Sequence, residues 1–158
     1  MTPQPTTPSY KGVALTQGFE QCRLHAYLPT PRDVPTIGWG ATGPDIHLGL
    51  TWTQAECDAR FSQDLARFAR SVTQLLTGGS STTQNQFDAL VDFAYNEGAQ
   101  ALHSSHLLAY HREGNYLLAA SQFPLWNTQK HIVLNGLTRR RVLERALYLT
   151  PQLADTSR

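Results

Sequence analysis

The spacing of apolar residues predicts a long helix in the middle of the chain. Between residues 53 and 77, apolar side chains recur at steps of three and four, which places them on one helix face. They are Phe61, Leu65, Phe68, Val72 and Leu76. Thr53 and Glu56 have the spacing of a capping box, and Gly78 and Gly79 end the pattern. At 1.5 Å per residue this helix spans on the order of 35 Å, enough to connect two lobes.

A second capping box, Thr83 with Gln86, begins another predicted helix, which ends around residues 96–98. We expect this helix to be buried on one face. The apolar residues of that face are Phe87, Leu90, Val91 and Ala94. Ser104 or Ser105 can cap a following helix, and Asn115 can cap a short one.

The last predicted helix covers residues 137–149 and is amphipathic. Its inward residues are expected to be Val142, Leu143, Ala146 and Leu147. Three consecutive arginines, residues 139–141, lie near its start, and Pro151 closes it. Successive helical residues differ by about 100° in direction, so at most one or two of the arginines can share a face.

The first fifty residues follow a different pattern. Residues 1–8 are rich in proline and threonine and predict a flexible lead-in. Ser9 is a candidate N-cap for a helix that ends at Glu20. The segment after it contains three prolines that exclude a helix and favour turns and short strands. They are Pro29, Pro31 and Pro35.

Together these elements predict an α+β fold in one domain over residues 9–158. It would consist of a small α+β lobe (9–52), a connecting helix (53–77) and a helical lobe (80–150). The chain of 158 residues is long enough to bury one compact core. Its net charge of +1 includes no dense basic block, so we expect no nucleic-acid partner.

No apolar run reaches the roughly 18 residues of a membrane helix, and the N-terminus lacks the charged and apolar blocks of a secretory signal. We therefore expect no stable membrane anchor and accumulation in the cytoplasm. The two cysteines, Cys22 and Cys57, fit neither a disulfide framework nor a zinc motif. They are interpreted as small, partly buried thiols, with a disulfide between them as the alternative.

Glu20 is the main candidate for chemistry. It is placed where an apolar helix ends, so the negative end of the helix dipole and a partly apolar wall both disfavour its ionised form. A carboxyl group in that setting is suited to act as a general acid. The alternative is an ordinary surface glutamate at a helix end.

Five segments in order resemble the phage-type lysozymes, the endolysin muramidases of glycoside hydrolase family twenty-four. They are GFE at 18–20, RLHAY at 23–27, TIGWGAT at 36–42, FDALVDFAYNEGAQAL at 87–102 and GLTRRRVLERALY at 136–148. The resemblance implies a lysozyme-like fold and cleavage of the β-1,4 bond between N-acetylmuramic acid and N-acetylglucosamine in peptidoglycan. Glu20 would protonate the departing oxygen.

The resemblance also implies partners and a location. Peptidoglycan glycan strands would be the substrate, and the enzyme would act as a monomer that needs no cofactor. It would stay in the host cytoplasm until a separate holin releases it to the cell wall in the periplasm.

The chain departs from the family pattern at the second carboxylate that most glycosidases use. The family has an aspartate nine residues after the glutamate, where this chain has Pro29; counted back from TIGWG, the position holds Thr30. Asp33 is the acidic residue of this loop. It is either a turn residue, since aspartate tolerates a left-handed conformation, or a displaced second carboxylate.

Thr36 matches the family threonine that holds the attacking water, and the alternative is a threonine chosen for its β propensity. If Asp33 faces away, Glu20 with Thr30 and Thr36 could still position water. Alternatively, the enzyme could be a lytic transglycosylase. An inactive peptidoglycan-binding protein is the interpretation from a different class.

Four more residues are candidates for contact with substrate or acid. Arg140 or Arg141 corresponds to a family arginine near the catalytic glutamate. Asn96 can reach sugar or cap its helix. Trp39, between two glycines, is the best of three aromatic candidates for stacking on a sugar ring. The six histidines form no metal-ligand pattern, so no metal is expected.

Overall fold

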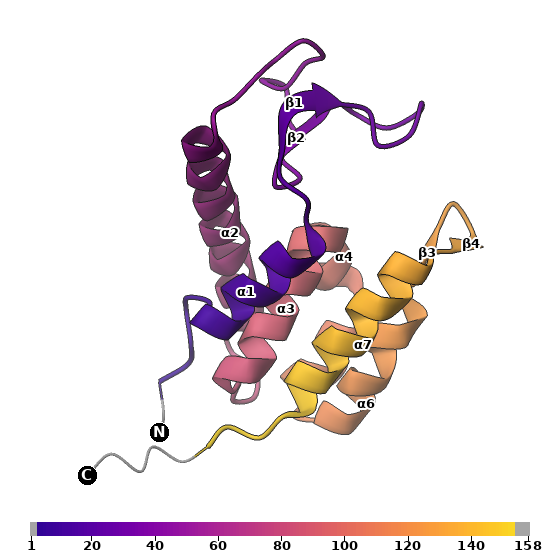
Figure 1. Cartoon of the computed structure of the whole chain (residues 1–158). Coiled ribbons are helices and arrows are strands. Elements are labelled where there is room, and N and C mark those ends of the chain that lie inside the picture. Colours follow the sequence, from indigo (N-terminus) through magenta and orange to yellow (C-terminus); the bar gives the residue numbers. More distant parts are fainter. Residues whose placement is uncertain (1–2, 154–158) are drawn as a thin grey trace. The chain divides into compact units, whose positions relative to one another are not determined.

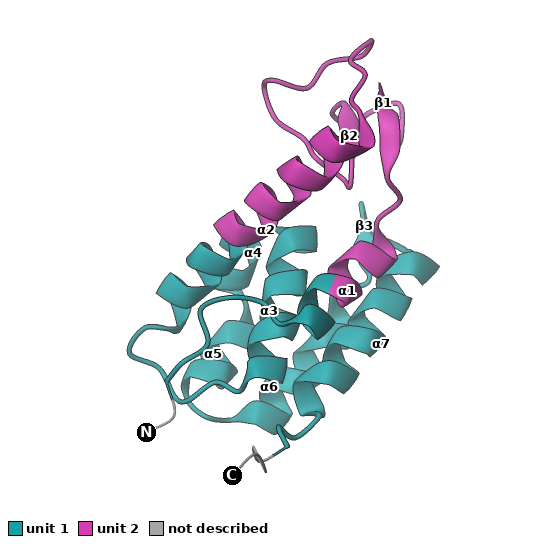
Figure 2. Ribbon diagram, turned by 60° about the vertical axis from the view of Figure 1, so that its left-hand side comes forward, with its two compact units in different colours: residues 1–13, 68–158 teal, residues 14–67 magenta. Residues whose placement is uncertain are grey.

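The computed structural model describes residues 3–153. The chain divides into two compact units: unit 2 is Ala14–Arg67, and unit 1 is Met1–Val13 with Phe68–Arg158 (Figure 2). The boundaries fall inside helix α1 (Tyr10–Phe19) and helix α2 (Gln54–Leu76). The predicted connecting helix is therefore confirmed as a helix, and its two halves belong to different units.

Unit 2 contains the antiparallel strands β1 (Arg23–Tyr27) and β2 (Thr36–Gly38), shown in Figure 1. Its small core consists of Ile37, Ala41 and Ile46, with partly buried apolar neighbours around them. The capping box at the start of α2 is confirmed. The Thr53 N–H donates to Glu56 Oε2 over 2.7 Å, and the Glu56 N–H donates to Thr53 Oγ1 over 3.2 Å.

Unit 1 is built around α3 (Gln84–Glu97). Its predicted capping box is present. The expectation that α3 is buried on one face is wrong, because every residue from Phe87 to Ala94 is buried. Both α4 (Ala99–Ser104) and α7 (Asn135–Leu149) pack against α3, which makes it a central helix.

The other helices of unit 1 are short. They are α5 (His106–Arg112), α6 (Tyr116–Gln122) and a 3-10 turn, Phe123–Leu125. Ser105 is the cap of α5, with its hydroxyl accepting from the Leu108 N–H over 3.1 Å. The hairpin β3 (Thr128–Gln129) and β4 (Ile132–Val133) was not predicted. Its turn places Lys130 and His131 at positive φ without a glycine or asparagine to signal it.

Helix α7 differs most from the prediction. Val142 and Leu143, expected inside, are 56% and 42% exposed. Ala146 is exposed and Leu147 is only half-buried. The buried face instead carries Arg140, Arg141, Glu144 and Tyr148. Opposite charges that bind one another can be buried, so apolar periodicity alone selected the wrong face.

Part of the predicted flexible lead-in is bound to the rest of unit 1. The Gln4 side-chain oxygen accepts from the Thr82 N–H over 2.9 Å. The Thr7 carbonyl accepts from Gln84 Nε2 over 3.0 Å. Within residues 3–153, no helix combines the length and the apolar character that crossing a membrane requires.

Candidate active site

Glu20 directly follows α1, as the sequence predicts. Its N–H donates to the Gln17 carbonyl over 3.2 Å, a bond that tightens the last helical turn. The residue is half-buried. It therefore lies at the negative end of a helix while staying accessible to a reactant.

The TIGWGAT segment forms a tight turn beside Glu20. Ile37 and Ala41 exchange two backbone hydrogen bonds, of 3.0 and 2.8 Å, and enclose three residues between them. Gly40, in this turn, has φ +88°, which L-residues rarely adopt. Its Cα faces the Glu20 carboxylate so closely that a Cβ there would lie 2.9 Å from Glu20 Oε2. The fold thus brings two of the family-like motifs together.

Thr36 begins β2 and is buried, with 7% of its surface exposed. Its hydroxyl donates to the Val34 carbonyl over 3.1 Å. The hydroxyl proton is thereby engaged, while the oxygen keeps lone pairs that can accept a hydrogen bond from water.

Asp33 and Thr30 share a turn. The Asp33 N–H donates to the Thr30 carbonyl over 3.0 Å, with Pro31 at the second position of the turn. The expectation that Asp33 adopts a left-handed conformation is wrong. Among the described residues other than glycine, positive φ occurs at Lys130 and His131 and not at Asp33. Within residues 3–153 the half-buried Asp33 carboxylate has no hydrogen bond or ion pair.

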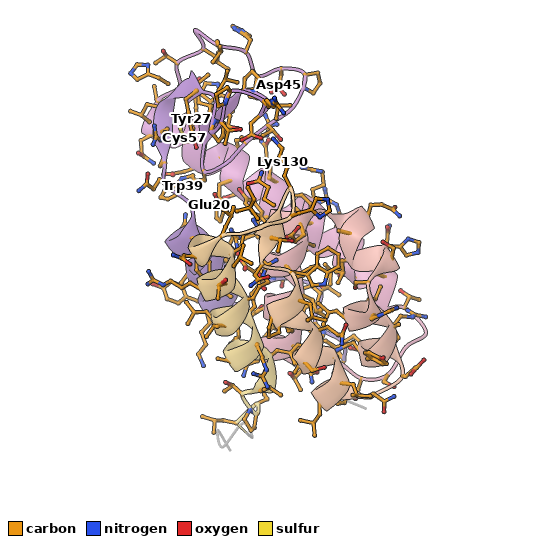
Figure 3. The ribbon with its side chains drawn as sticks, turned by 90° about the vertical axis from the view of Figure 1, so that its right-hand side faces the viewer. Glu20, Tyr27, Trp39, Asp45, Cys57 and Lys130 are labelled. Carbon is orange, nitrogen blue, oxygen red and sulfur yellow. The ribbon has the colours of Figure 1, made fainter. Side chains whose placement is uncertain are left out.

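Trp39, labelled with Glu20 in Figure 3, is half-buried and fixed to α2. Its indole N–H donates to Asp58 Oδ1 over 2.8 Å, and its ring centroid lies 6.2 Å from that of Phe61. Hydrogen bonds from Trp39 and Gln54 hold the pKa of Asp58 below its usual value. Residues of α2 therefore set the orientation of the indole ring. The sequence analysis did not predict this role for Asp58.

Arg140 lies in unit 1 and forms a two-pronged pair with Asp92 of α3. Its Nε donates to Oδ2 over 3.0 Å, and a terminal nitrogen donates to Oδ1 over 2.8 Å. Both side chains are almost completely buried. Such parallel bonds are the strongest geometry for an arginine and a carboxylate.

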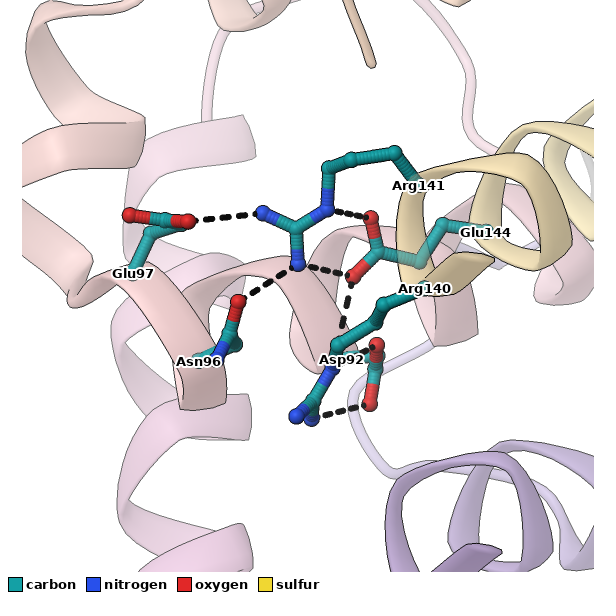
Figure 4. A network of polar contacts seen from close by, with 6 residues as sticks. All are labelled: Asp92, Asn96, Glu97, Arg140, Arg141 and Glu144. Atoms are coloured by element: carbon teal, nitrogen blue, oxygen red, sulfur yellow. Dashed lines mark hydrogen bonds and ion pairs between the residues drawn. The ribbon is translucent and has the colours of Figure 1, made fainter. Parts of the chain in front are cut away.

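Arg141 is also fully buried and binds three side chains (Figure 4). Its terminal nitrogens donate to Glu97 Oε1 over 2.9 Å, to Asn96 Oδ1 over 2.7 Å and to Glu144 Oε1 over 2.8 Å. Its Nε lies 2.8 Å from Glu144 Oε2. Asn96 does not cap α3, because the Gly98 N–H closes that end on the Ala94 carbonyl. The third arginine, Arg139, is exposed.

Glu144, like Asp92, is a completely buried acid of this network. Burial raises its pKa well above the usual value, and the neighbouring Asp92 raises it further, while Arg141 and Arg140 act in the opposite direction. The network, with Asp92, Glu97 and Glu144 as its acids, is a second feature that the sequence analysis missed. The sequence indicates this network by the charged residues that interrupt the apolar positions of α7.

The two cysteines lie in unit 2 and are not bonded to each other. Burial raises the pKa of the Cys57 thiol to about 11, with a further contribution from the Cys22 thiol. Among the described residues, no three His, Cys, Asp or Glu side chains form a group able to hold a metal.

Comparisons with known proteins find relatives in sequence and in fold. The phage lysozyme family model matches residues 17–144. The endolysin of Bacillus phage B103 is 40% identical over 151 residues, which cover 95% of this chain and 57% of that protein. The endolysin of Acyrthosiphon pisum secondary endosymbiont phage 1 is 34% identical, covering 89% of this chain and 96% of that one.

Among solved structures, the muramidase domain of SpmX from Asticaccaulis excentricus has a TM-score of 0.82 and 34% identity, covering 94% of this chain and 100% of that chain. The endolysin from Escherichia coli O157:H7 phage FAHEc1 has a TM-score of 0.77 and 33% identity, covering 89% of this chain and 92% of that chain.

The fold is thus the α+β fold of lysozymes, with a glutamate at the end of the first helix. The chain belongs to the phage lysozyme family. It spans 57 to 63% of the Bacillus and Lactococcus phage endolysins that it matches.

Proposed function

We propose that the protein is a muramidase that hydrolyses the β-1,4 bond between N-acetylmuramic acid and N-acetylglucosamine in peptidoglycan. The observation that carries this proposal is the position of Glu20, half-buried at the end of α1 and directly against the Gly40 turn. Family membership supports the same substrate.

Glu20 is the proposed general acid. Its carboxyl proton passes to the glycosidic oxygen of the departing N-acetylglucosamine, while water attacks the anomeric carbon of N-acetylmuramic acid. The products are a free hydroxyl on one sugar and a reducing end on the other. This chemistry requires an acid, a water molecule and a base, and no cofactor.

Thr36 and Asp33 are the proposed partners of the water. The Thr36 oxygen can accept a hydrogen bond from it, since the hydroxyl proton is used by Val34. Asp33 is the proposed base: its backbone serves the turn, which leaves its carboxylate without a structural task among the described residues. Thr30 and Trp39 are proposed to contact sugar.

Asn96 was predicted to reach sugar or to cap its helix, and Arg140 or Arg141 to lie near the acid. We propose that their main task is to stabilise unit 1, because their polar atoms bind buried partners within that unit. The relatives named endolysins support a further proposal about cell biology. The enzyme would be a monomer that leaves the host cytoplasm with the help of a holin and lyses the cell from the periplasm.

Digestion of purified peptidoglycan, followed by mass spectrometry of the released muropeptides, tests the proposed reaction. Reducing N-acetylmuramic acid ends are expected. The departure at the second carboxylate favours one rival reaction, in which the sugar's own hydroxyl attacks. That lytic transglycosylase would release anhydro ends lighter by one water. Binding without release would identify an inactive protein.

A further inference from the structure

Gly40 approaches the Glu20 carboxylate closely enough to leave no room for a side chain. A Cβ built on Gly40 would lie 2.9 Å from Glu20 Oε2, 3.5 Å from its Cδ and 4.0 Å from Oε1. The first distance is shorter than carbon and oxygen atoms tolerate without a shift. A side chain at position 40 and the present carboxylate position therefore exclude each other.

The turn cannot easily yield to such a side chain. Its two ends, Ile37 and Ala41, are buried in the unit 2 core and are joined by two backbone hydrogen bonds. Trp39, directly before Gly40, is held by Asp58 and packs on Phe61. The Glu20 carboxylate, in contrast, is the far end of a side chain with three rotatable bonds. The carboxylate is the part that would move.

We infer that Gly40 is a positioning residue for the general acid: the missing side chain sets where the Glu20 carboxylate lies relative to the bond that it protonates. This inference rests on the proposed function of Glu20. Displacing a catalytic group by about 1 Å can cost roughly 100-fold in rate, because proton transfer depends on reach and alignment.

The first test compares Gly40→Ala with a matched control, Gly49→Ala. Both glycines lie in unit 2 at similar positive φ, +88° and +94°, so alanine strains the backbone in both variants. A Cβ on Gly49 would meet nothing within 4 Å. We expect similar losses of Tm. The kcat on peptidoglycan should fall roughly 10- to 100-fold in Gly40→Ala alone, with KM changed less than about twofold.

A double-mutant cycle with Glu20→Asp separates displacement of the acid from general damage to the fold. Aspartate is one methylene shorter and leaves room for a Cβ at position 40. We expect Gly40→Ala to cost less than about threefold in the Glu20→Asp background, against the larger loss in the wild type. The alkaline limb of the pH–rate profile should move in Gly40→Ala and stay in place in Gly49→Ala. Equal losses in both backgrounds, or in both glycine variants, would overturn the inference.

A spectroscopic readout keeps the inference separate from the proposed function. The carboxyl carbon of Glu20, labelled with ¹³C, should change its chemical shift in Gly40→Ala and keep it in Gly49→Ala. An unchanged signal in Gly40→Ala would contradict the positioning role. If the wild type released no sugar from peptidoglycan, the proposed function would fail, while this measurement would still decide whether Gly40 places the carboxylate.

Discussion

Glu20 of unit 2 directly follows helix α1 and Glu144 of unit 1 lies within helix α7, and their surroundings are opposite. Glu20 is half-buried at a helix end against a glycine, whereas Glu144 is completely buried and bound twice by Arg141. A carboxyl group that must give a proton to a substrate has to be reachable. A carboxyl group that is completely buried and paired with arginine cannot reach a substrate. We therefore propose that unit 2 carries the chemistry and that the charge network of unit 1 stabilises the fold.

The largest expected effect is on activity and comes from unit 2. Glu20→Gln keeps the shape of the side chain and removes the proton donor, so muropeptide release should fall about a thousandfold or more. Because Glu20 is only half-buried and glutamine has nearly the same size, Tm should stay within about 2 °C of the wild type. Activity close to that of the wild type would end its assignment as the acid.

The next effect is on stability and comes from unit 1. Arg141→Met removes the partner of Glu144 and Glu97 and leaves buried charge uncompensated, which should cost about 3 to 5 kcal/mol in urea unfolding. Arg139→Met, on the exposed side of the same helix, is the control and should change stability by less than about 0.5 kcal/mol. Equal stability of the two variants would contradict the role of the network.

A third prediction concerns pH. His111 of unit 1 is buried between Thr82 Oγ1 at 2.8 Å and Tyr148 Oη at 2.6 Å. Burial lowers the pKa of His111 to about 4 from the ordinary 6.5. Between pH 4 and pH 6.5 the unfolded chain binds more protons than the folded one. The contribution of neutral His111 to the free energy of unfolding is therefore complete above pH 6.5 and is lost as the pH falls toward 4.

The full loss is on the order of 3 kcal/mol, at 1.36 kcal/mol for each pKa unit. Urea unfolding from pH 7 to pH 4 should therefore show a smaller decline for His111→Gln than for the wild type. Parallel curves for the two proteins would show that His111 does not carry this pH dependence.

The smallest predicted effect tests the second carboxylate. Asp33→Asn should lower kcat at least roughly tenfold if the carboxylate serves as base for water. Arg32→Gln changes the adjacent, exposed residue of the same turn and should leave kcat nearly unchanged. An Asp33→Asn variant as active as Arg32→Gln would mean that Asp33 serves only the turn.

Sequence patterns were reliable where local interactions decide the structure. Both capping boxes and the start of α5 formed as expected, because a cap needs only residues three or four positions apart. The position of Glu20 at the end of α1 was likewise predictable. The buried face of α7 was not, since the pairing of Arg140 with Asp92 joins residues 48 positions apart. The approach of Gly40 to Glu20 was not predicted either, because these residues are also distant in the sequence.

The most direct test of the central claim asks whether Glu20 donates a proton to the leaving group. Wild type and Glu20→Gln should be compared on peptidoglycan and on a synthetic glycan of the same type with a 2,4-dinitrophenolate leaving group, which needs no protonation. The variant should lose about a thousandfold or more on peptidoglycan and less than about tenfold on the synthetic glycan. Equal losses on both substrates would contradict the assignment of Glu20 as the general acid.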